Sequence, residues 1–149
     1  MPKYLMVALI DAERFGSDMY SVETDDGVSL SPKDTFEKHC FPLTDATRIT
    51  QAEVDAMIGA VDQTQVSPKT TLVRVIAKTG YEDYATSSCV DPANYDDAIG
   101  TKLGLKTIED RLWSHLGFAL QWAKNGLTTA TAEANEHLES KPPTEDVED

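Results

Sequence analysis

The residues that could do chemistry lie where an apolar, alternating run ends and an amphipathic pattern begins, over residues 88–95. Asp91 is a good helix N-cap and Pro92 suits the first helical position, so a helix is predicted to begin here. The free backbone N–H groups and the positive dipole end of a helix favour an anion such as phosphate. Asn94 can hydrogen-bond to a base or ribose edge, and Tyr95 can stack on a flat ring. These residue types point to binding of a nucleotide-like ligand.

A purely structural interpretation of the same residues stays open. Asp91 can simply cap the helix, in which case its carboxylate competes with an anion for the N–H groups. Asn94 can stabilise the turn, and Tyr95 can lie in the core. Lys106, one helical turn after Lys102, is a further source of positive charge. The residues expected to bind a ligand are Arg74, Tyr84, Asn94, Tyr95, Lys102 and Arg111.

Signatures of enzymes and metal sites are absent from the sequence. It has no P-loop, no nucleophile elbow, no zinc-protease motif and no dinucleotide-binding glycine run. The adjacent carboxylates of Asp96–Asp97 and of Glu109–Asp110 diverge by about 100° on a helix, so neither pair makes a shared acid–base site. Cys40 and Cys89 are expected to be reduced thiols near the core. We therefore expect no catalysis, no cofactor and no metal site.

Length and charge limit the classes of partner. The chain has 149 residues, typical of one domain or of one domain with a small appendage, and a formal net charge of −13. Nearly half of that excess lies in residues 128–149, which hold seven acidic residues and one basic residue. General nucleic-acid binding is not expected, because it requires clustered Lys and Arg. No apolar run approaches the roughly 20 residues of a membrane span, so a cytoplasmic protein is expected.

The first 43 residues are predicted to form a small β-rich appendage. Residues 4–10 are an apolar run that predicts a buried strand. Residues 19–23 predict its partner strand, and residues 25–27 (Asp-Asp-Gly) predict the turn that follows. The prediction for residues 1–43 is therefore a short sheet whose core includes the first apolar run.

A short helix is predicted to complete this appendage. Ser31 can act as its N-cap, Pro32 suits its first position, and Asp34 completes a capping box. The helix would bury Phe36 and end near His39. The appendage would then hold two kinds of element, strands and one helix, before the main domain begins.

Residues 44–127 are predicted to form the main domain, and a capping box at Thr50 and Glu53 opens its first helix. This helix is expected to run through about Val61, with one face made of Val54, Met57, Ile58 and Val61. A β-hairpin follows: a strand over residues 71–77, a turn at Thr79-Gly80 and a return over residues 81–88. Alternation puts Leu72, Arg74 and Ile76 on one hairpin face, and Thr71, Val73, Val75 and Ala77 on the other.

The longest predicted element is an amphipathic helix of about 22 residues that begins at Pro92. Its apolar stripe consists of Tyr95, Ile99, Leu103, Ile108, Leu112, Trp113 and Leu116. A continued or second helix is expected to end at Asn125-Gly126. Residues 128–149 are expected to be an acidic, disordered tail. The fold class predicted is α+β, an antiparallel β-hairpin or sheet packed against a long amphipathic helix plus two shorter helices.

Two glycines, Gly100 and Gly104, lie one turn apart on the long helix. Each costs about 1 kcal/mol relative to alanine in a helix, so a close approach of another helix or of a ligand is expected to compensate. A wide apolar stripe with G-x-x-x-G is also typical of an oligomer seam in a small protein. Trp113 is expected in the core, whereas Trp122 can lie either in the core or at an interface.

Several of these residues resemble the gp-forty-nine-like family of small tailed-phage accessory proteins. The resemblance is carried by the run C-V-D-P-A-N-Y-D-D-A-I-G at residues 89–100, then by Leu112-Trp113 and by residues 116–120 (L-G-F-A-L). It covers about residues 48–122. The family label names a gene neighbourhood more than an activity, and the N-terminal appendage is unusual for the family.

The hairpin-then-long-helix layout is also similar to that of Thoeris anti-defence sponge proteins. This resemblance implies a phage-encoded sponge in the host cytoplasm that sequesters a cyclic nucleotide or cyclic ADP-ribose-type immune signal. The site would be an oligomer interface built from the long helix, with Arg74 and Arg111 compensating buried phosphates. The alternative is an acidic phage protein that binds and inhibits a host or defence protein. A minor virion or assembly component is a third possibility.

Overall fold

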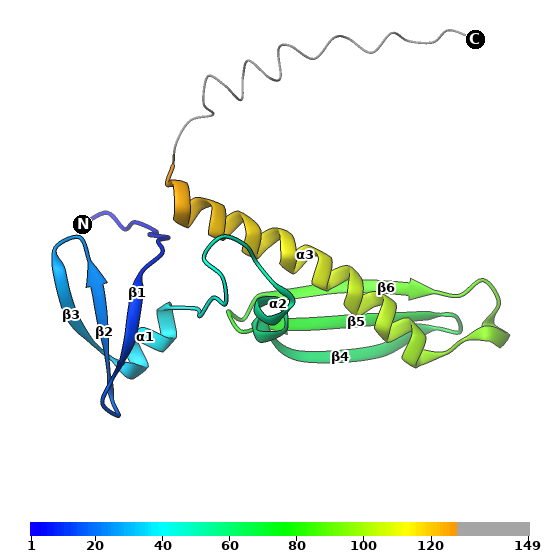
Figure 1. Cartoon of the computed structure of the whole chain (residues 1–149). Helices are drawn as coiled ribbons and strands as arrows, with labels where there is room; N and C mark the ends of the chain where they lie inside the picture. The colour runs from blue at the N-terminus through cyan, green and yellow to red at the C-terminus, as the bar shows by residue number, and fades with distance from the viewer. Residues whose placement is uncertain (128–149) are drawn as a thin grey trace, which may run out of the picture.

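The computed structural model describes residues 1–127 of the chain. This part contains two three-stranded antiparallel sheets and three α-helices, the last of which is long (Figure 1). The predicted α+β fold, an antiparallel sheet packed against a long helix with two shorter helices, is confirmed. The prediction made for residues 128–149 lies outside the described residues.

Three short strands joined by tight turns make the N-terminal sheet. Its order is β1-β2-β3, with antiparallel neighbours. The elements are β1 (Asp11–Phe15), β2 (Met19–Thr24), β3 (Gly27–Pro32) and helix α1 (Lys33–His39). Tyr20 of β2 stacks on Phe36 of α1, with ring centroids 4.1 Å apart, so α1 covers one face of the sheet. The strand predicted over residues 19–23 and the turn after it are confirmed.

Residues 4–10 do not form the buried strand that their apolar run predicts. They have no regular secondary structure, and most of their side chains are exposed, including Leu5 at 76% and Met6 at 85%. The strand register explains the difference. Asp11 pairs with Glu23, one residue before β2 ends, so no strand lies beside the residues that precede Asp11. Backbone pairing therefore begins only after the apolar run.

Helix α1 confirms the predicted short helix, but its beginning differs from the prediction. Ser31 and Pro32 belong to β3 and pair with β2, so both are extended. Ser31 is therefore not the N-cap, and Pro32 precedes the helix and is not its first residue. The helix begins at Lys33 without a side-chain cap, and Phe36 is half-buried. The β2–β3 ladder holds both residues because it satisfies their backbone groups in the strand.

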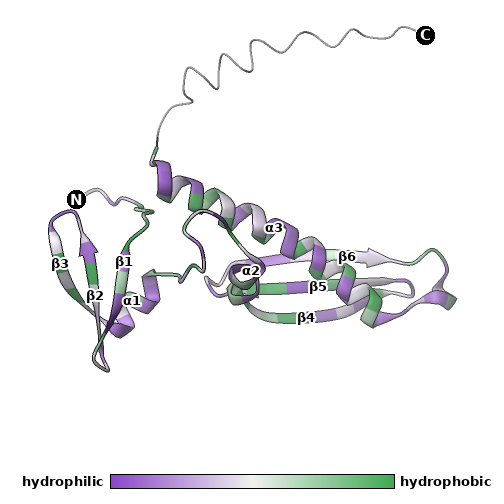
Figure 2. Ribbon diagram, in the orientation of Figure 1, coloured by the Kyte–Doolittle hydropathy of each residue, from purple (hydrophilic) through white to green (hydrophobic). Residues whose placement is uncertain are grey.

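The second sheet and its helices form the rest of the described chain. Its order is β4-β5-β6, again antiparallel throughout. The elements are α2 (Gln51–Met57), β4 (Ile58–Ser67), β5 (Thr70–Ala77) and β6 (Glu82–Ser88). The predicted hairpin of residues 71–88 is confirmed as β5 and β6. Figure 2 shows β5 as a largely hydrophobic strand with hydrophilic bands.

Helix α2 is shorter than predicted, and the residues that were expected to continue it form strand β4. The helix ends at Met57, and Ile58 already has extended dihedral angles. Val61, predicted on the helix face, pairs instead with Val75 of β5. Residues 58–67 contain four β-branched side chains, which suit a pleated strand, and pairing with β5 satisfies their backbone groups. The long strand β4 was therefore missed.

The long helix is α3 (Asp97–Asn125), a single helix of 29 residues that lies over β5 and β6 (Figure 1). It begins five residues later than predicted, because Pro92–Asn94 form a separate 3₁₀ turn capped by Asp91. The region predicted as a continued or second helix belongs to the same helix. Its end at Gly126, with φ of 64°, confirms the predicted glycine stop.

The main hydrophobic core lies between α3 and the central strand. It contains Val73, Val75, Ala85 and Ile108, with Ile58 and Leu105 packed against it. The predicted hairpin faces are confirmed, since Thr71, Val73, Val75 and Ala77 are buried beneath the helix. The predicted apolar stripe is confirmed only in part. Ile108 and Leu112 are buried, but Ile99 and Leu103 are 59% and 52% exposed because they lie towards one side of the helix.

Candidate ligand-binding site

The turn from β6 into α3 is organised by two aspartate caps in succession. The Asp91 carboxylate accepts a hydrogen bond from the Ala93 N–H at 2.9 Å and closes the 3₁₀ turn. The Asp96 carboxylate accepts from the N–H groups of Ala98 and Ile99, at 2.9 and 3.1 Å, and caps α3. Both caps follow from the preference for Asp at this position. The N–H groups that a phosphate would use are therefore already occupied by carboxylates.

Tyr95 lies between the two caps and reaches back to the sheet. Its hydroxyl and the Thr71 Oγ1 are 3.0 Å apart and hydrogen-bonded. Thr71 is completely buried on β5, so this bond satisfies a hydroxyl that has no access to water. Tyr95 itself is half-buried. It therefore fixes the turn on the sheet and also presents part of its ring to solvent.

The first turns of α3 lie unusually close to β5. A Cβ added at Gly100 would lie 2.5 Å from Thr71 Oγ1, and one added at Gly104 would lie 2.5 Å from Val73 Cγ2. Both separations are shorter than van der Waals contact, so only glycine fits at either position. The close approach predicted for the G-x-x-x-G pair is confirmed, and its partner is the chain's own sheet. The hypothesis that this pair forms an oligomer seam is wrong, because β5 occupies the face.

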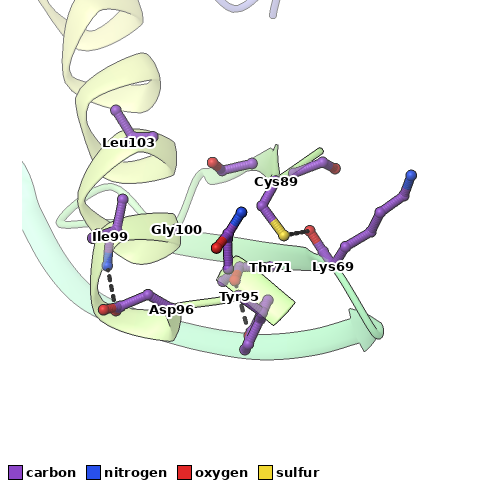
Figure 3. A pocket seen from close by; sticks show the side chains of 11 residues that line it. Lys69, Thr71, Cys89, Tyr95, Asp96, Ile99, Gly100 and Leu103 are labelled. Carbon is purple, nitrogen blue, oxygen red and sulfur yellow. Dashed lines mark hydrogen bonds between the residues drawn. The ribbon is translucent and has the colours of Figure 1, made fainter. Parts of the chain in front are cut away.

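A pocket of about 230 Å³ opens beside this contact, between the start of α3 and the ends of β5 and β6 (Figure 3). One wall is apolar and comes from Ile99 and Leu103 of α3. The opposite side is polar and includes Lys69 and Asn94. The lining residues are Lys69, Thr71, Ser87, Ser88, Cys89, Asn94, Tyr95, Asp96, Ile99, Gly100 and Leu103. An apolar wall facing a few polar groups is typical of a small-molecule site.

The charge in this pocket is small. Lys69 is the only basic residue in its lining, and the carboxylate of Asp96 is engaged with the helix N-terminus. Cys89 donates its S–H to the backbone of the same turn, with Sγ 3.1 Å from Asp91 O. Ser88 shares a 2.8 Å hydrogen bond with Thr70, at the β5–β6 edge of the sheet. The pocket can offer one cation, several hydroxyl and amide groups and a flat apolar wall.

The structure separates the residues that were predicted to bind one ligand. Asn94 and Tyr95 line the pocket. Arg74 and Tyr84 lie side by side on the face of the sheet that points away from α3. Arg111 joins α3 to β6, and Lys102 is exposed on the surface of α3, as is Lys106, which pairs with Asp110. The six residues predicted to bind one ligand therefore lie at four separate places in the structure.

Arg74 is held by acidic neighbours on the open face of the sheet. Its Nε donates to Asp62 Oδ2 at 2.9 Å, Nη2 also contacts Asp62, and Nη1 lies 3.7 Å from Glu82. The hydrogen bonds that Arg74 donates to Asp62 raise the pKa of Arg74, and the side chain of Tyr84 raises it further. Tyr84 donates its hydroxyl to Glu82 at 2.7 Å. An arginine and an aromatic ring are adjacent here, but carboxylates already satisfy the guanidinium.

Arg111 has a structural partner as well. Its Nη1 donates to Asp83 Oδ1 at 2.7 Å and to the backbone oxygen of Tyr84 at 2.8 Å. These two bonds tie the middle of α3 to β6. The side chain of Asp83 on β6 is largely buried. The guanidinium is thus directed at the protein's own sheet.

Lys69, Ser87 and Ser88 are among the pocket residues that were not predicted to bind a ligand. Lys69 lies in the turn between β4 and β5. Ser87 and Ser88 end the return strand, and Ser87 pairs with Thr71. Alternation along the predicted hairpin could have placed Ser87 on the helix-covered face beside Thr71. Nothing in the sequence marks Lys69 as its neighbour, because that placement requires strand β4.

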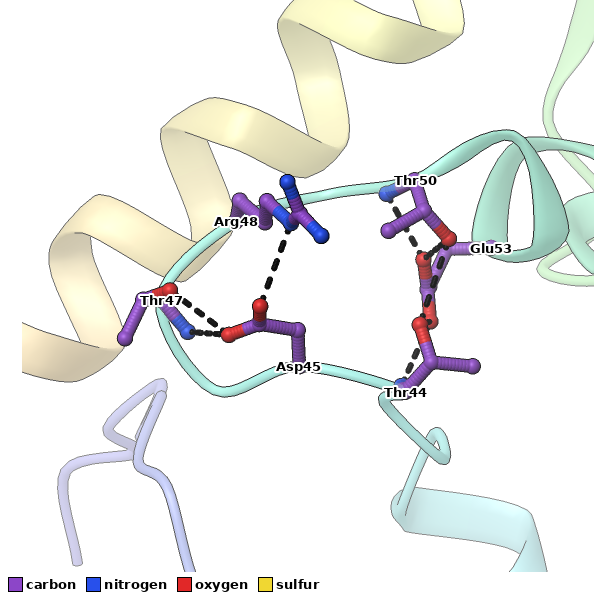
Figure 4. A network of polar contacts seen from close by, with 6 residues as sticks. All are labelled: Thr44, Asp45, Thr47, Arg48, Thr50 and Glu53. Carbon is purple, nitrogen blue, oxygen red and sulfur yellow. Dashed lines mark hydrogen bonds and ion pairs between the residues drawn. The ribbon is translucent and has the colours of Figure 1, made fainter.

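A second polar cluster surrounds the buried carboxylate of Glu53 (Figure 4). Glu53 is 2% exposed and accepts hydrogen bonds from the N–H and hydroxyl of both Thr44 and Thr50, at 2.5–2.8 Å. The Thr50 hydroxyl and then the Thr44 donors lower the pKa of Glu53 to about 2. The predicted capping box is confirmed. All four donors belong to the protein, so this cluster fixes the loop before α2 and leaves no group for a ligand.

No group of three His, Cys, Asp or Glu side chains in residues 1–127 is arranged to hold a metal ion. None of the helices in this range combines the length and the apolar character needed to cross a bilayer. Cys40 and Cys89 are both free thiols, and burial raises the pKa of Cys40.

Comparison with known proteins agrees with the signature around the pocket. No solved structure matches the chain. Residues 49–123, half of the sequence, match a phage protein family described by phage N4 Gp49 and phage Sf6 gene 66. This range contains both walls of the pocket, from Lys69 to Leu103. The expected resemblance to the gp-forty-nine-like proteins is therefore confirmed, and the chain belongs to the phage protein (N4 Gp49/phage Sf6 gene 66) family.

Proposed function

We propose that this phage protein works by binding and not by catalysis, and that it sequesters a cyclic nucleotide or cyclic ADP-ribose-type immune signal in the host cytoplasm. The observation that carries the proposal is the position of the signature residues. Residues 89–100 hold the turn and the first helical turn that line the pocket, and they lie within the family match.

The pocket's chemistry suits one nucleotide unit. Ile99 and Leu103 offer an apolar surface for a base, and the half-buried ring of Tyr95 lies in the same lining. Asn94 can donate and accept at a base edge, and the serine hydroxyls of β6 can contact a ribose. At about 230 Å³ the pocket is smaller than the roughly 300–1,000 Å³ of drug-sized sites, so a larger cyclic ligand would extend beyond it.

The charge distribution makes Lys69 the phosphate ligand in this proposal. Asp91 and Asp96 occupy the N–H groups of the turn and of α3, so the helix start is not available to an anion. Arg74 and Arg111 lie outside the pocket lining and are paired with carboxylates. A single lysine contact predicts binding that weakens as salt rises, because an exposed charge pair is screened.

A thermal-shift panel of cyclic dinucleotides, cyclic trinucleotides and cyclic ADP-ribose isomers tests the proposal. A ligand at 100 times its Kd should stabilise the wild type by about 2.7 kcal/mol, a rise in Tm of several degrees. Lys69→Ala and Leu103→Glu should abolish this rise. The matched control Lys102→Ala, on the exposed surface of α3, should keep it. No shift with any ligand, or an equal shift in all three variants, would overturn the proposal.

A second candidate is inhibition of a host or defence protein through an acidic surface. The observation that favours it is the open face of the β4-β5-β6 sheet, where Asp62 and Glu82 flank Arg74 on a chain of net charge −13. Such binding would lose affinity steeply with salt. Charge reversal by Asp62→Lys and Glu82→Lys should then abolish inhibition of the defence system during infection, while the pocket variants leave it intact.

A further inference from the structure

The apolar segment before β1 is the largest exposed apolar feature of the described chain that has no partner. We name residues 4–10 the arm. Five of its seven side chains are exposed large hydrophobics, and it has no regular secondary structure. Figure 1 shows it as an irregular trace outside both sheets. A contiguous apolar segment in water is unfavourable, and on a soluble protein it marks a site of contact.

The order of residues in the arm is nearly symmetrical about Val7. Leu5 and Leu9 lie two residues to either side, and the aromatic Tyr4 is matched by the β-branched Ile10. The first charged residues on each side, Lys3 and Asp11, are both four residues from Val7 and have opposite charges. In an antiparallel pairing of two copies about Val7, this order places apolar residues opposite apolar residues and Lys3 opposite Asp11.

We propose that two copies of the chain associate by pairing their arms antiparallel, with Val7 of each copy at the two-fold axis. In this register Leu5 lies opposite Leu9 of the second copy, and Lys3 lies opposite Asp11. The pairing has the symmetry of an isologous dimer, in which the same patch meets itself. Each arm satisfies the backbone groups of the other, as strands do at a sheet edge.

Electrostatics favour a second copy as the occupant. Each chain has a net charge of −13, so most surfaces of two copies repel. The arm has no charged residue, and its flanking charges attract in this register. Pairing β1 with β1 would instead bring Asp11 and Glu13 of both copies together. The arm can thus be shared by two copies without like charges, whereas the adjoining strand β1 cannot.

Continuity with the N-terminal sheet also favours pairing. The arm runs directly into β1, an edge strand whose neighbour β2 ends beside Asp11. A free two-stranded ribbon is marginal in water, but paired arms would connect two three-stranded sheets. Val22, at 8% exposed, is the one buried hydrophobic residue in the strands of that small sheet, so the added contacts would enlarge a small core.

The first test is the mass of the full chain in solution, measured by light scattering after size-exclusion chromatography, at concentrations up to about 0.5 mM. A mass of twice 16.3 kDa is expected. Val7→Asp places two carboxylates at the two-fold axis and should raise the dimer Kd by about 100-fold. The control Val90→Asp adds the same charge at an exposed valine outside the arm and should leave the Kd unchanged.

The second test fixes the register. Lys3→Asp and Asp11→Lys each turn both flanking pairs from attraction to repulsion, so each should raise the dimer Kd by about tenfold. The double variant restores opposite charges and should return the Kd to within about threefold of wild type. Circular dichroism should show the same fold in all variants, because Lys3 lies outside both sheets and Asp11 is the exposed first residue of β1.

Three results overturn the proposal. They are a monomer at every concentration, a dimer that Val7→Asp does not weaken, and single charge variants that the double variant does not rescue. None of these results depends on a ligand, so the test is independent of the function proposed for the pocket.

Discussion

Gly100 of helix α3 lies so close to Thr71 of strand β5 that no side chain fits between them. A Cβ at position 100 would lie 2.5 Å from Thr71 Oγ1 and 2.9 Å from Thr71 Cβ. Thr71 cannot move away easily, because it is completely buried and its hydroxyl is bonded to Tyr95. The contact therefore joins three parts of the region that matches the family: the central strand, the turn and the first helical turn.

Gly100→Ala is expected to destabilise the protein by about 1–3 kcal/mol, the usual cost of forcing an extra methyl group into a packed core. The gain in helix propensity of up to about 1 kcal/mol only partly offsets this cost. The change in free energy of unfolding can be measured by urea titration followed by circular dichroism.

Gly117→Ala is the matched control, because Gly117 lies in the same helix and its added Cβ would meet nothing within 4 Å. There the helix propensity acts alone, so the variant should be more stable than wild type by up to about 1 kcal/mol. Equal effects of the two substitutions would contradict the close contact at Gly100.

Tyr95→Phe should lower stability by about 1–2 kcal/mol, because it leaves the buried hydroxyl of Thr71 without its partner. Thr71→Val removes the other half of the bond and keeps the volume. If the hydrogen bond between Tyr95 and Thr71 causes both losses of stability, the double variant should lose much less stability than the sum of the two single losses. Additive losses in this double-mutant cycle would show that the two side chains are not coupled.

The sequence allowed local elements to be predicted better than their partners. The β5–β6 hairpin and its two faces could be read from alternation around Thr79-Gly80, and the end of α3 could be read from Gly126. The strand β4 could not be predicted, because residues 51–61 have a helix cap and helical spacing, and only pairing with β5 makes Ile58 the start of a strand. Tertiary pairing overrode local propensity there.

The candidate site was predictable in the same uneven way. Asn94 and Tyr95 follow from the turn between the hairpin and the helix, and both line the pocket. Arg74 and Arg111 were predicted to bind a ligand because of their charge. Charge alone does not indicate which way a side chain points. The structure pairs each with a carboxylate from a neighbouring strand, Asp62 or Asp83. These partners are distant in sequence, so only the strand register reveals them.

Arg111→Ala should lower the stability of the ligand-free protein by about 1 kcal/mol, since the side chain ties α3 to β6 through Asp83 and a backbone oxygen. That loss corresponds to a fall in Tm of roughly 2–4 °C. Asp83→Asn should have a similar effect, and the two changes together should not be additive. An unchanged Tm in the absence of ligand would argue that Arg111 is free to serve a ligand.

Acid should destabilise the protein through Glu53. Its pKa in the folded protein is about 2, against an ordinary value of 4.5, because four hydrogen bonds from Thr44 and Thr50 favour the carboxylate. Unfolding releases these bonds, so the unfolded chain binds a proton at higher pH than the folded chain. The contribution of Glu53 is thus fully present above about pH 4.5 and is lost as pH falls towards 2.

Glu53→Gln should remove this part of the pH dependence. Glutamine cannot accept four hydrogen bonds from two threonines, because one carboxylate oxygen becomes an NH₂ donor. The variant should therefore be less stable than wild type at neutral pH, and the difference between the two urea midpoints should shrink as pH falls through this window. Thr44→Val, which removes one donor, should give an intermediate profile. Parallel profiles for wild type and Glu53→Gln would mean that the Glu53 carboxylate is not held as the structure shows.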